Sequence, residues 1–236
     1  SDVAEFFMDL VRRHAPSALV VFDTVDLHFL REERMAQVHK SRSLCSLAAK
    51  RKKTELGLMG KSDMVLVVSS YEKDLLATEC PQSRVEILSN IHDVYPLGAG
   101  FDERDGILFI GGFNHPPNTD AAIYLVQEVL PLVSKELGQI PTYLIGSQPT
   151  QQVYALGSKN VHVPGFVPDI EPYFSKVKLS VAPLRYGAGV KGKINMSMAY
   201  GVPVVATSIA VEGMHLEHGR SVLVGDDPES FARHVV

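Results

Sequence analysis

The sequence predicts an α/β fold in which parallel strands alternate with helices in doubly wound layers. Short runs of apolar, often β-branched residues recur along the 236 residues, as expected for strands that helices cover on both faces. Helical stretches stand between many of these runs, an alternation that is typical of doubly wound sheets. Because 45% of the residues are hydrophobic and 21% are charged, the chain can bury a sizeable core.

In the first part of the chain, apolar runs predict three strands, and spaced apolar residues predict the helices between them. The expected helices are Val3–Arg13, Leu30–Gly60 and Tyr71–Thr78, and the expected strands are Ala18–Phe22, Met64–Val68 and Val85–Leu88. An α/β domain normally opens with a strand and a Gly-rich turn, whereas this chain opens with a helix. We therefore expect the first domain to be incomplete.

The second part of the chain repeats the alternation more fully. The expected strands are Ile107–Ile110, Thr142–Ile145, Val161–Val163, Leu179–Ala182, Val202–Ala206 and Ser221–Val224. The expected helices are Asn118–Glu136, Gln151–Ala155, Gly192–Tyr200 and Pro228–His234. Between the two parts, Asn90–Gly106 is rich in Gly and Pro and has almost no apolar periodicity. The predicted domains are therefore residues 1–97 and 98–236.

Composition excludes several classes of protein. The formal net charge is −4, so nucleic acid is not a favoured partner. The longest apolar runs, such as Met64–Val68, are far shorter than the ~20 residues of a membrane span. Cys45 and Cys80 form neither a disulfide framework nor a CxxC pair, which favours a reduced, cytoplasmic setting and no cysteine metal site. The first residue is Ser1 rather than Met, which indicates a processed chain or a fragment.

The loop after Leu179–Ala182 is the most informative segment for function. Three glycines let backbone N–H groups approach an anion, and the N-terminus of the following helix adds partial positive charge. The glycines are Gly187, Gly189 and Gly192, and three cations accompany them, namely Arg185, Lys191 and Lys193. We predict a pyrophosphate site here; the alternative is a mobile loop with solvated lysines.

Two familiar phosphate motifs match this loop only by letter. Gly187-x-Gly189-x-x-Gly192 fits the dinucleotide fingerprint, but no acidic residue follows the next strand to hold a ribose. Gly192-Lys193 could close a Walker A loop, but Ile194 stands where Ser or Thr would bind Mg²⁺. Both motifs fail, and the phosphate prediction does not depend on either.

Two further loops follow strands in the second part. Gly111, Gly112 and Asn114 follow Ile107–Ile110, and Asn118 or Thr119 is expected to cap the next helix. Small glycines before a helix N-terminus again suit an anion, but an ordinary turn is equally compatible with the sequence. After Val202–Ala206, the loop holds Glu212 and Gly213. Since ligands bind beyond the carboxyl ends of parallel strands, Glu212 is a candidate for sugar or ribose hydroxyls, with a solvated carboxylate as the alternative.

The first part of the chain carries two weaker indications of function. Asp23, Asp26 and His28 come at the end of a predicted strand. Two carboxylates and a histidine could bind a metal, but the sequence supplies no further cluster of ligands. We therefore expect these side chains to face a cleft or to cap the next helix. Lys40–Lys53 holds six basic residues and no acid. This stretch either forms a solvated helix or is weakly attracted to an anionic membrane surface.

Together these residues resemble the family 4 (group 1) glycosyltransferases, which have the GT-B fold. The most specific match is PLRYGAGVKGKINMSMAYGVPVVA at Pro183–Ala206. The similarity extends to ILFIGGFNHPPNTDAAIYLVQEVLP, VPGFVPDIEPYF, VEGMHLEHGRSVLVGDDPESFA, SDMVLVVSSYE and VEILSNIHD. The resemblance implies two Rossmann-like domains, a nucleotide-sugar donor held mainly by the second, and metal-independent transfer, usually with retention, to a glycan or lipid-linked acceptor.

Carried over residue by residue, the resemblance assigns roles to this chain. The catalytic residues would be the cations Arg185, Lys191 and Lys193, which stabilise the charge that develops on the leaving diphosphate. The donor-binding residues would be Gly111, Gly112, Asn114, Gly187, Gly189, Ser197, Glu212 and Gly213. Asp26 and His28 would lie on the acceptor side, and no metal or cofactor beyond the donor is implied.

The chain departs from the family pattern in two ways. The family commonly has two glutamates, and the second of them contacts the ribose. In this chain Ala188 and Met196 hold those places. Asn195 or Ser197 is therefore the candidate for a substitute hydrogen bond to the ribose. The family's opening strands and closing helix find no match, which implies a fragment that binds the donor but catalyses poorly. The main alternative to a glycosyltransferase is a non-catalytic module that binds a nucleotide or a partner. A third possibility, a nicotinamide-dependent dehydrogenase, is supported only by the glycine pattern.

Overall fold

The computed structural model describes residues 2–96 and 98–236, which form two compact units. The first unit comprises Ser1–Asn90 with the loops Tyr186–Val190 and Glu212–Met214. The second comprises Ile91–Arg185, Lys191–Val211 and His215–Val236. Leu97, at which our predicted boundary falls, lies outside the described residues.

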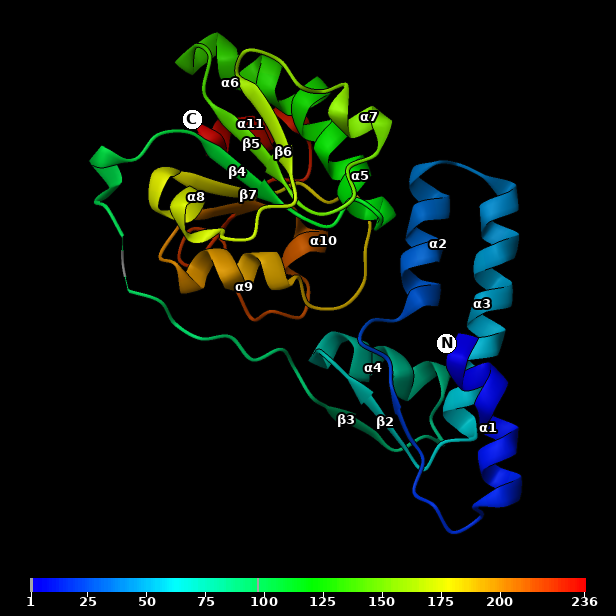
Figure 1. The fold of residues 1–236 in the computed structure, drawn as a ribbon. Helices are drawn as coiled ribbons and strands as arrows, with labels where there is room; N and C mark the ends of the chain where they lie inside the picture. The colour runs from blue at the N-terminus through cyan, green and yellow to red at the C-terminus, as the bar shows by residue number, and fades with distance from the viewer. Residues whose placement is uncertain (1, 97) are drawn as a thin grey trace. The chain divides into compact units, whose positions relative to one another are not determined.

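The first unit is a small parallel sheet with helices around it (Figure 1). Its strands are β1 (Val21–Asp23), β2 (Met64–Val67) and β3 (Val85–Ile87), hydrogen-bonded in the order β1-β2-β3 and all parallel. Its helices are α1 (Asp2–His14), α2 (His28–Val38), α3 (Arg42–Gly60) and α4 (Ser70–Glu79). All three strands predicted in this part form, although β1 begins later than expected, at Val21.

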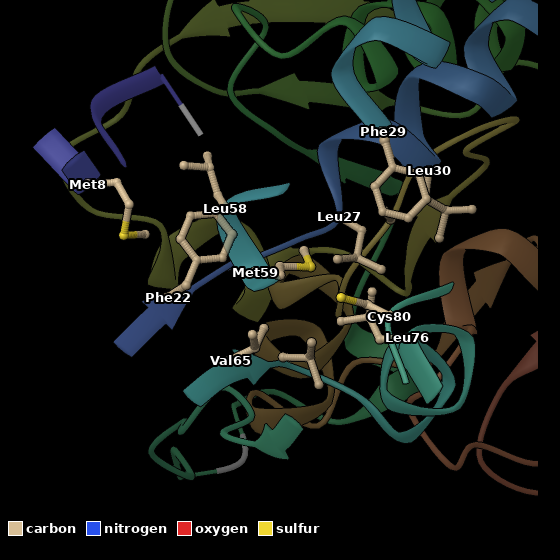
Figure 2. Close-up of a cluster of buried hydrophobic side chains, with 12 residues drawn as sticks. Met8, Phe22, Leu27, Phe29, Leu30, Leu58, Met59, Val65, Leu76 and Cys80 are labelled. Carbon is tan, nitrogen blue, oxygen red and sulfur yellow. The ribbon is translucent and has the colours of Figure 1, made fainter. Parts of the chain in front are cut away.

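The core of this unit is built from side chains that are far apart in the sequence. Figure 2 shows Phe22 of β1 and Val65 of β2 beside Leu58 and Met59 of α3, with Leu76 of α4. Met59, Val65 and Leu76 are fully buried. At roughly 1.5–3 kcal/mol for each large apolar side chain removed from water, this cluster is the main force that closes the unit.

The single helix predicted over Leu30–Gly60 is wrong, because the structure breaks it into α2 and α3. Lys40 adopts a left-handed backbone conformation, with φ of 48°, and ends α2. The hydroxyl of Ser41 then caps α3 by accepting a hydrogen bond from the N–H of Leu44. A lysine at a positive φ is uncommon, so the residues at the break do not indicate a turn.

The second unit is a larger parallel sheet of six strands. Its strands are β4 (Ile107–Ile110), β5 (Thr142–Ile145), β6 (Val161–Gly165), β7 (Leu179–Ala182), β8 (Val204–Ala206) and β9 (Leu223–Val224). Its helical segments are η1 (Phe101–Glu103), α5 (Pro116–Tyr124), η2 (Leu125–Val129), α6 (Leu130–Leu137), α7 (Gln151–Tyr154), α8 (Glu171–Lys176), α9 (Gly192–Ala199), α10 (Ser208–Val211) and α11 (Pro228–Val235). The sequence pattern did not predict η1, α8 or α10, which are all short.

The strand order β6-β5-β4-β7-β8-β9 defines where a ligand is expected to bind. From β4 the chain first adds β5 and β6 on one side, and then returns to add β7, β8 and β9 on the other. Figure 1 shows α5 and α6 on one face of this sheet and α9 on the opposite face. The order therefore reverses between β4 and β7, and in such sheets ligands bind beyond the carboxyl ends of the strands at that point.

The helix after β4 begins earlier than the sequence predicted. Neither Asn118 nor Thr119 is its N-cap, because α5 starts at Pro116 with His115 in the capping position. Proline suits this first turn, since it has no N–H to leave unsatisfied. The predicted helix Asn118–Glu136 is continuous in α5, η2 and α6, with a π-helical segment just before Pro131. Within the described residues, no helix is long and apolar enough to cross a membrane.

Candidate functional site

The loops that follow β4 and β7 meet at the strand reversal. The strands pair directly, with Ile107 opposite Leu179 and Leu108 opposite Ser180. The first loop carries Gly111 and Gly112, and the second carries Arg185 and leads to Lys191 and the start of α9. Two segments predicted separately as phosphate loops therefore lie next to each other, at the edge of the sheet where ligands bind.

Gly111 is required by close packing rather than by its backbone angles. A Cβ added at Gly111 would come within 2.6 Å of the side chain of Asn118. On the other side, a Cβ added at Gly146 would meet the carbonyl oxygen of Gly111 at 1.8 Å. The turn after β4 is thus held between β5 and α5, with no room for larger residues.

Asn118 links the two loops through its side-chain amide. Its Nδ2 donates to the carbonyl of Gly112 at 2.8 Å, and its Oδ1 accepts from Nζ of Lys193. The side chain is buried. Because one amide bonds both the turn after β4 and the helix after β7, Asn118 fixes the position of Lys193 relative to Gly112.

Arg185 is held by a carboxylate on α5. Its Nε donates to Oδ2 of Asp120 at 2.8 Å, and its Nη2 pairs with Oδ1 of the same residue. The guanidinium also lies over the ring of Tyr124, with 5.3 Å between Cζ and the ring centroid. The hydrogen bonds to Asp120 raise the pKa of Arg185 above its ordinary value and outweigh the opposing effect of burial, so the group is firmly cationic.

Lys193 differs electrostatically from Arg185. Burial lowers the pKa of its ammonium to about 7, and the charge of the neighbouring Lys191 contributes to this decrease. Its Nζ lies 4.6 Å from the ring centroid of Phe109, so β4 supplies an aromatic face beneath the cation. Lys191 itself is buried at the N-cap of α9. Two lysines therefore lie close together in a desolvated space.

Two predicted donor-binding residues of this unit differ in exposure. Asn114 is exposed beside the turn after β4, and a Cβ added at Gly112 would lie 3.1 Å from its Oδ1. Ser197, in contrast, is fully buried. Its hydroxyl is hydrogen-bonded to Ser180 at 2.7 Å and to the carbonyl of Lys193 at 2.8 Å, so it lies in the core instead of at the strand ends.

Four other predicted donor-binding residues belong to the first unit. They are Gly187, Gly189, Glu212 and Gly213. Arg34 of α2 donates to the carbonyl of Gly187 and to both carboxylate oxygens of Glu212, each at 2.8 Å. The Glu212 carboxylate is therefore engaged by a guanidinium, and any hydroxyl ligand would share it with Arg34.

Asp26 and His28 form a charged cluster beyond the carboxyl end of β1. His28 Nε2 lies 3.1 Å from Asp26, and its Nδ1 lies 3.2 Å from the buried Glu55. Arg31 also pairs with Asp26. The hydrogen bonds to Asp26 and Glu55 raise the pKa of His28 to about 9, so the imidazole is protonated at neutral pH.

The same cluster is joined to the backbone. Glu55 accepts the N–H of Phe29 at 2.9 Å and so satisfies a donor in the first turn of α2. Glu72 accepts the N–H groups of Leu27 and Val68. Both glutamates are buried, and no feature of the sequence indicated that either would bind this loop. Across residues 2–96 and 98–236, His, Cys, Asp and Glu side chains form no group of three that could hold a metal ion.

The comparisons with known proteins identify the family. The family model described as "Glycosyl transferases group 1" matches residues 104–236, which is more than half of the chain. This chain belongs to the group 1 glycosyl transferases. A curated relative, an uncharacterized 44.6 kDa protein in the cps region of Klebsiella pneumoniae, is 25% identical over 185 residues, covering 71% of this chain and 47% of the relative.

Solved structures share the fold of this group 1 glycosyl transferase. Anabaena HepE in complex with UDP-glucose aligns with a TM-score of 0.73 at 14% identity, covering 99% of this chain and 65% of that one. Sucrose-phosphate synthase from Thermosynechococcus elongatus aligns with a TM-score of 0.62 at 20% identity, covering 79% and 51%. A TarM mutant from S. aureus, in complex with Fondaparinux, alpha-GlcNAc-glycerol and UDP, aligns with a TM-score of 0.66 at 16% identity, covering 79% and 38%.

These similarities confirm the predicted fold class, a mixed α/β fold with parallel sheets like that of the GT-B glycosyltransferases. The chain spans about half the length of the curated relative and less than two thirds of each solved structure named above. The fragment interpretation stays a prediction.

Proposed function

We propose that the chain binds a nucleotide-diphosphate sugar and takes part in transferring the sugar to a glycan or lipid-linked acceptor. The transfer would be metal-independent and proceed with retention. The observation that carries the proposal is the group of cations at the reversal of strand order, with Arg185 and Lys193 held by α5 and Lys191 at the start of α9. A diphosphate suits this group because it is a compact dianion with several acceptor oxygens.

The cations would act on the leaving group. When the glycosidic bond to the donor breaks, negative charge develops on the diphosphate, and fixed positive groups in a desolvated site stabilise that charge. Arg185, Lys191 and Lys193 are proposed for this role, with Gly111, Gly112 and Asn114 lining the donor. Family membership supports the proposal, as does the structural similarity to HepE, which was solved in complex with UDP-glucose.

The two parts of the chain would have different binding roles, one for the donor and one for the acceptor. Residues 98–236 are proposed to bind the donor, and residues 1–97 to contribute the later half of an acceptor-side domain. In the first unit, Asp26 and His28 are the candidates for acceptor hydroxyls. Because both ring N–H groups of His28 face Asp26 and Glu55 and its pKa is raised, it would contribute positive charge and would not serve as a base at neutral pH. Gly187, Gly189, Glu212 and Gly213 are proposed for the donor sugar.

A non-catalytic nucleotide-binding module is the second candidate. It is favoured by Met196, which stands where the family commonly has the glutamate that contacts the ribose, and by Ser197, whose hydroxyl is buried in the core. Neither residue offers the ribose a carboxylate. Turnover of the donor is therefore the property that separates the two candidates.

Calorimetric titration with a panel of nucleotide sugars tests donor binding. We expect one or more members of the panel to bind, with Lys193→Ala weakening the complex and reducing the thermal stabilisation that the ligand provides. Binding of no nucleotide sugar at all would reject the proposal. Release of nucleotide from the donor by this protein, abolished by Arg185→Ala or Lys191→Ala, would reject the non-catalytic module.

We further propose a role in polysaccharide biosynthesis in the cytoplasm, with weak peripheral association at the inner face of the membrane. The cps-region relative supports the first part. The basic residues of α3 support the second, although Arg51 and Lys52 lie in ion pairs with acids of the same unit. Co-sedimentation with anionic vesicles, compared with neutral vesicles, tests the association; equal sedimentation would exclude an electrostatic contribution.

A further inference from the structure

We propose that Asp120 is a positioning residue that orients the guanidinium of Arg185 for the donor's diphosphate, an inference that rests on the proposed function. The carboxylate bonds one edge of the guanidinium, at Nε and Nη2. Among the described residues, two of the five N–H donors of Arg185 are used in this way, which leaves three for a ligand. A planar fork fixed along one edge presents its other edge in a single direction.

Burial supports a positioning role for Asp120 and a ligand-contacting role for Arg185. The side chain of Asp120 is 8% exposed, whereas that of Arg185 is 35% exposed. The carboxylate therefore lies beneath the guanidinium, away from solvent, and the arginine lies at the surface of the site. Tyr124, also on α5, contributes its ring at 5.3 Å from Cζ. One helix thus restrains both an edge and a face of the guanidinium.

Charge alone predicts the opposite effect of Asp120. A carboxylate beside an anion site repels the incoming anion and neutralises part of the attraction from Arg185. If Asp120 were only a background charge, its removal would tighten binding of a diphosphate. If Asp120 orients Arg185, its removal weakens binding, because the freed side chain must be ordered again when the ligand arrives. The sign of the change separates the two explanations.

The experiment is calorimetric titration of the 236-residue chain with UDP-glucose, and in parallel with inorganic pyrophosphate, for wild type and a set of matched variants. Asp120→Asn preserves shape and removes the charge. Glu128→Gln is the control, because Glu128 is exposed and acts on Arg185 only through its charge. We expect about a 3–10-fold loss of affinity for Asp120→Asn, at least partial rescue by Asp120→Glu, and unchanged or slightly tighter binding for Glu128→Gln.

The Arg185→Ala background provides the decisive test. Arg185→Ala alone is expected to weaken binding by about tenfold or more. In that background there is no guanidinium to orient, so Asp120→Asn should leave the affinity unchanged or improve it. This reversal of sign would not arise from a general loss of structure. Melting temperatures without ligand identify any variant that is unfolded, and the Asp120→Glu variant then carries the comparison.

The outcomes distinguish this inference from the proposed function. If wild type binds neither UDP-glucose nor pyrophosphate, the proposed function fails and the role of Asp120 fails with it. If wild type binds, Arg185→Ala weakens binding, and Asp120→Asn binds as tightly as wild type or more tightly, the proposed function stands and the positioning role is overturned. Equal losses from Asp120→Asn in the wild-type and Arg185→Ala backgrounds would also overturn it.

Discussion

His28 lies between two carboxylates, and this arrangement predicts how the first unit responds to pH. The pKa of His28 is raised from 6.5 to about 9, chiefly by its hydrogen bonds to Asp26 and Glu55. A raised folded-state pKa contributes stability that is complete below pH 6.5 and is lost as the pH rises through about 9. After allowance for partial exposure and solvent screening, we expect the protonated imidazole to contribute about 1–2 kcal/mol.

The measurement is the difference in melting temperature between wild type and His28→Asn across this range. That difference should be several degrees at about pH 6 and should shrink by about pH 9.5. Comparing the two proteins at each pH cancels the contributions of other titrating groups, including Lys193 in the second unit. A difference that stays constant over the whole range would show that the charge of His28 contributes nothing.

Lys193 predicts a pH dependence for donor binding. Because its pKa is lowered to about 7, much of the ammonium is neutral above that pH, and binding of a diphosphate must then be accompanied by uptake of a proton. The affinity for UDP-glucose, whose own charge is constant in this range, should fall as the pH rises from about 7 to about 8.5. The fall is at most about tenfold per pH unit.

Lys193→Arg is the matched variant, since a guanidinium keeps its charge throughout this range. Calorimetric affinities for this variant should be nearly independent of pH over the same interval. An equally steep fall in both proteins would assign the pH dependence to another group.

At the residue scale, the sequence predicted the cations but not their partners. Arg185, Lys191 and Lys193 stand close together in the sequence, so their type and spacing indicated a phosphate site. Asp120 lies on the helix after another strand, and its pairing with Arg185 depends on β4 and β7 being neighbours. Asn118 was predicted only as a helix cap, because its hydrogen bond to Lys193 also depends on β4 and β7 being neighbours.

At the scale of elements, the break between α2 and α3 carries backbone strain that can be removed. Lys40 is exposed and has φ of 48°, a conformation that costs a residue with a Cβ roughly 1–2 kcal/mol. Lys40→Gly should therefore raise the free energy of unfolding, by about 0.5–1 kcal/mol after the larger entropy of glycine in the unfolded chain is subtracted.

Urea denaturation of the two proteins measures this difference. Lys53→Gly, at an exposed position inside α3, is the matched control, and it should destabilise by about 1 kcal/mol. Destabilisation of comparable size by both substitutions would mean that Lys40 is not strained.

Element boundaries were predicted best where strands are buried on both faces. Ile107–Ile110, Thr142–Ile145 and Leu179–Ala182 match β4, β5 and β7 at both ends, since helices cover these central strands and nearly every residue is apolar. The edge strand β9 is shorter than predicted, whereas the other edge strand, β6, is longer. Short helices such as α8 and α10 have too few residues to show a periodicity.

At the scale of the whole molecule, the alternation of elements predicted the class of fold, but the order of strands had to come from the structure. Parallel strands joined by helices are compatible with several orders, and a single sequence does not distinguish them. The order β6-β5-β4-β7-β8-β9 brings the loops after β4 and β7 together. A ligand that binds there should stabilise the second unit in a way that can be localised along the chain.

Hydrogen exchange detected by mass spectrometry provides this localisation. With UDP-glucose at about 100 times its dissociation constant, binding should stabilise the protein by about 2.7 kcal/mol. The slowing of exchange should be concentrated in residues 111–120, which carry the turn after β4 and the first turn of α5, and in residues 191–199, which comprise Lys191 and α9. If its affinity is about tenfold lower, Arg185→Ala at the same ligand concentration should lose about half of this stabilisation. Protection that is absent from both segments while the ligand is bound would exclude the carboxyl ends of β4 and β7 as the donor site.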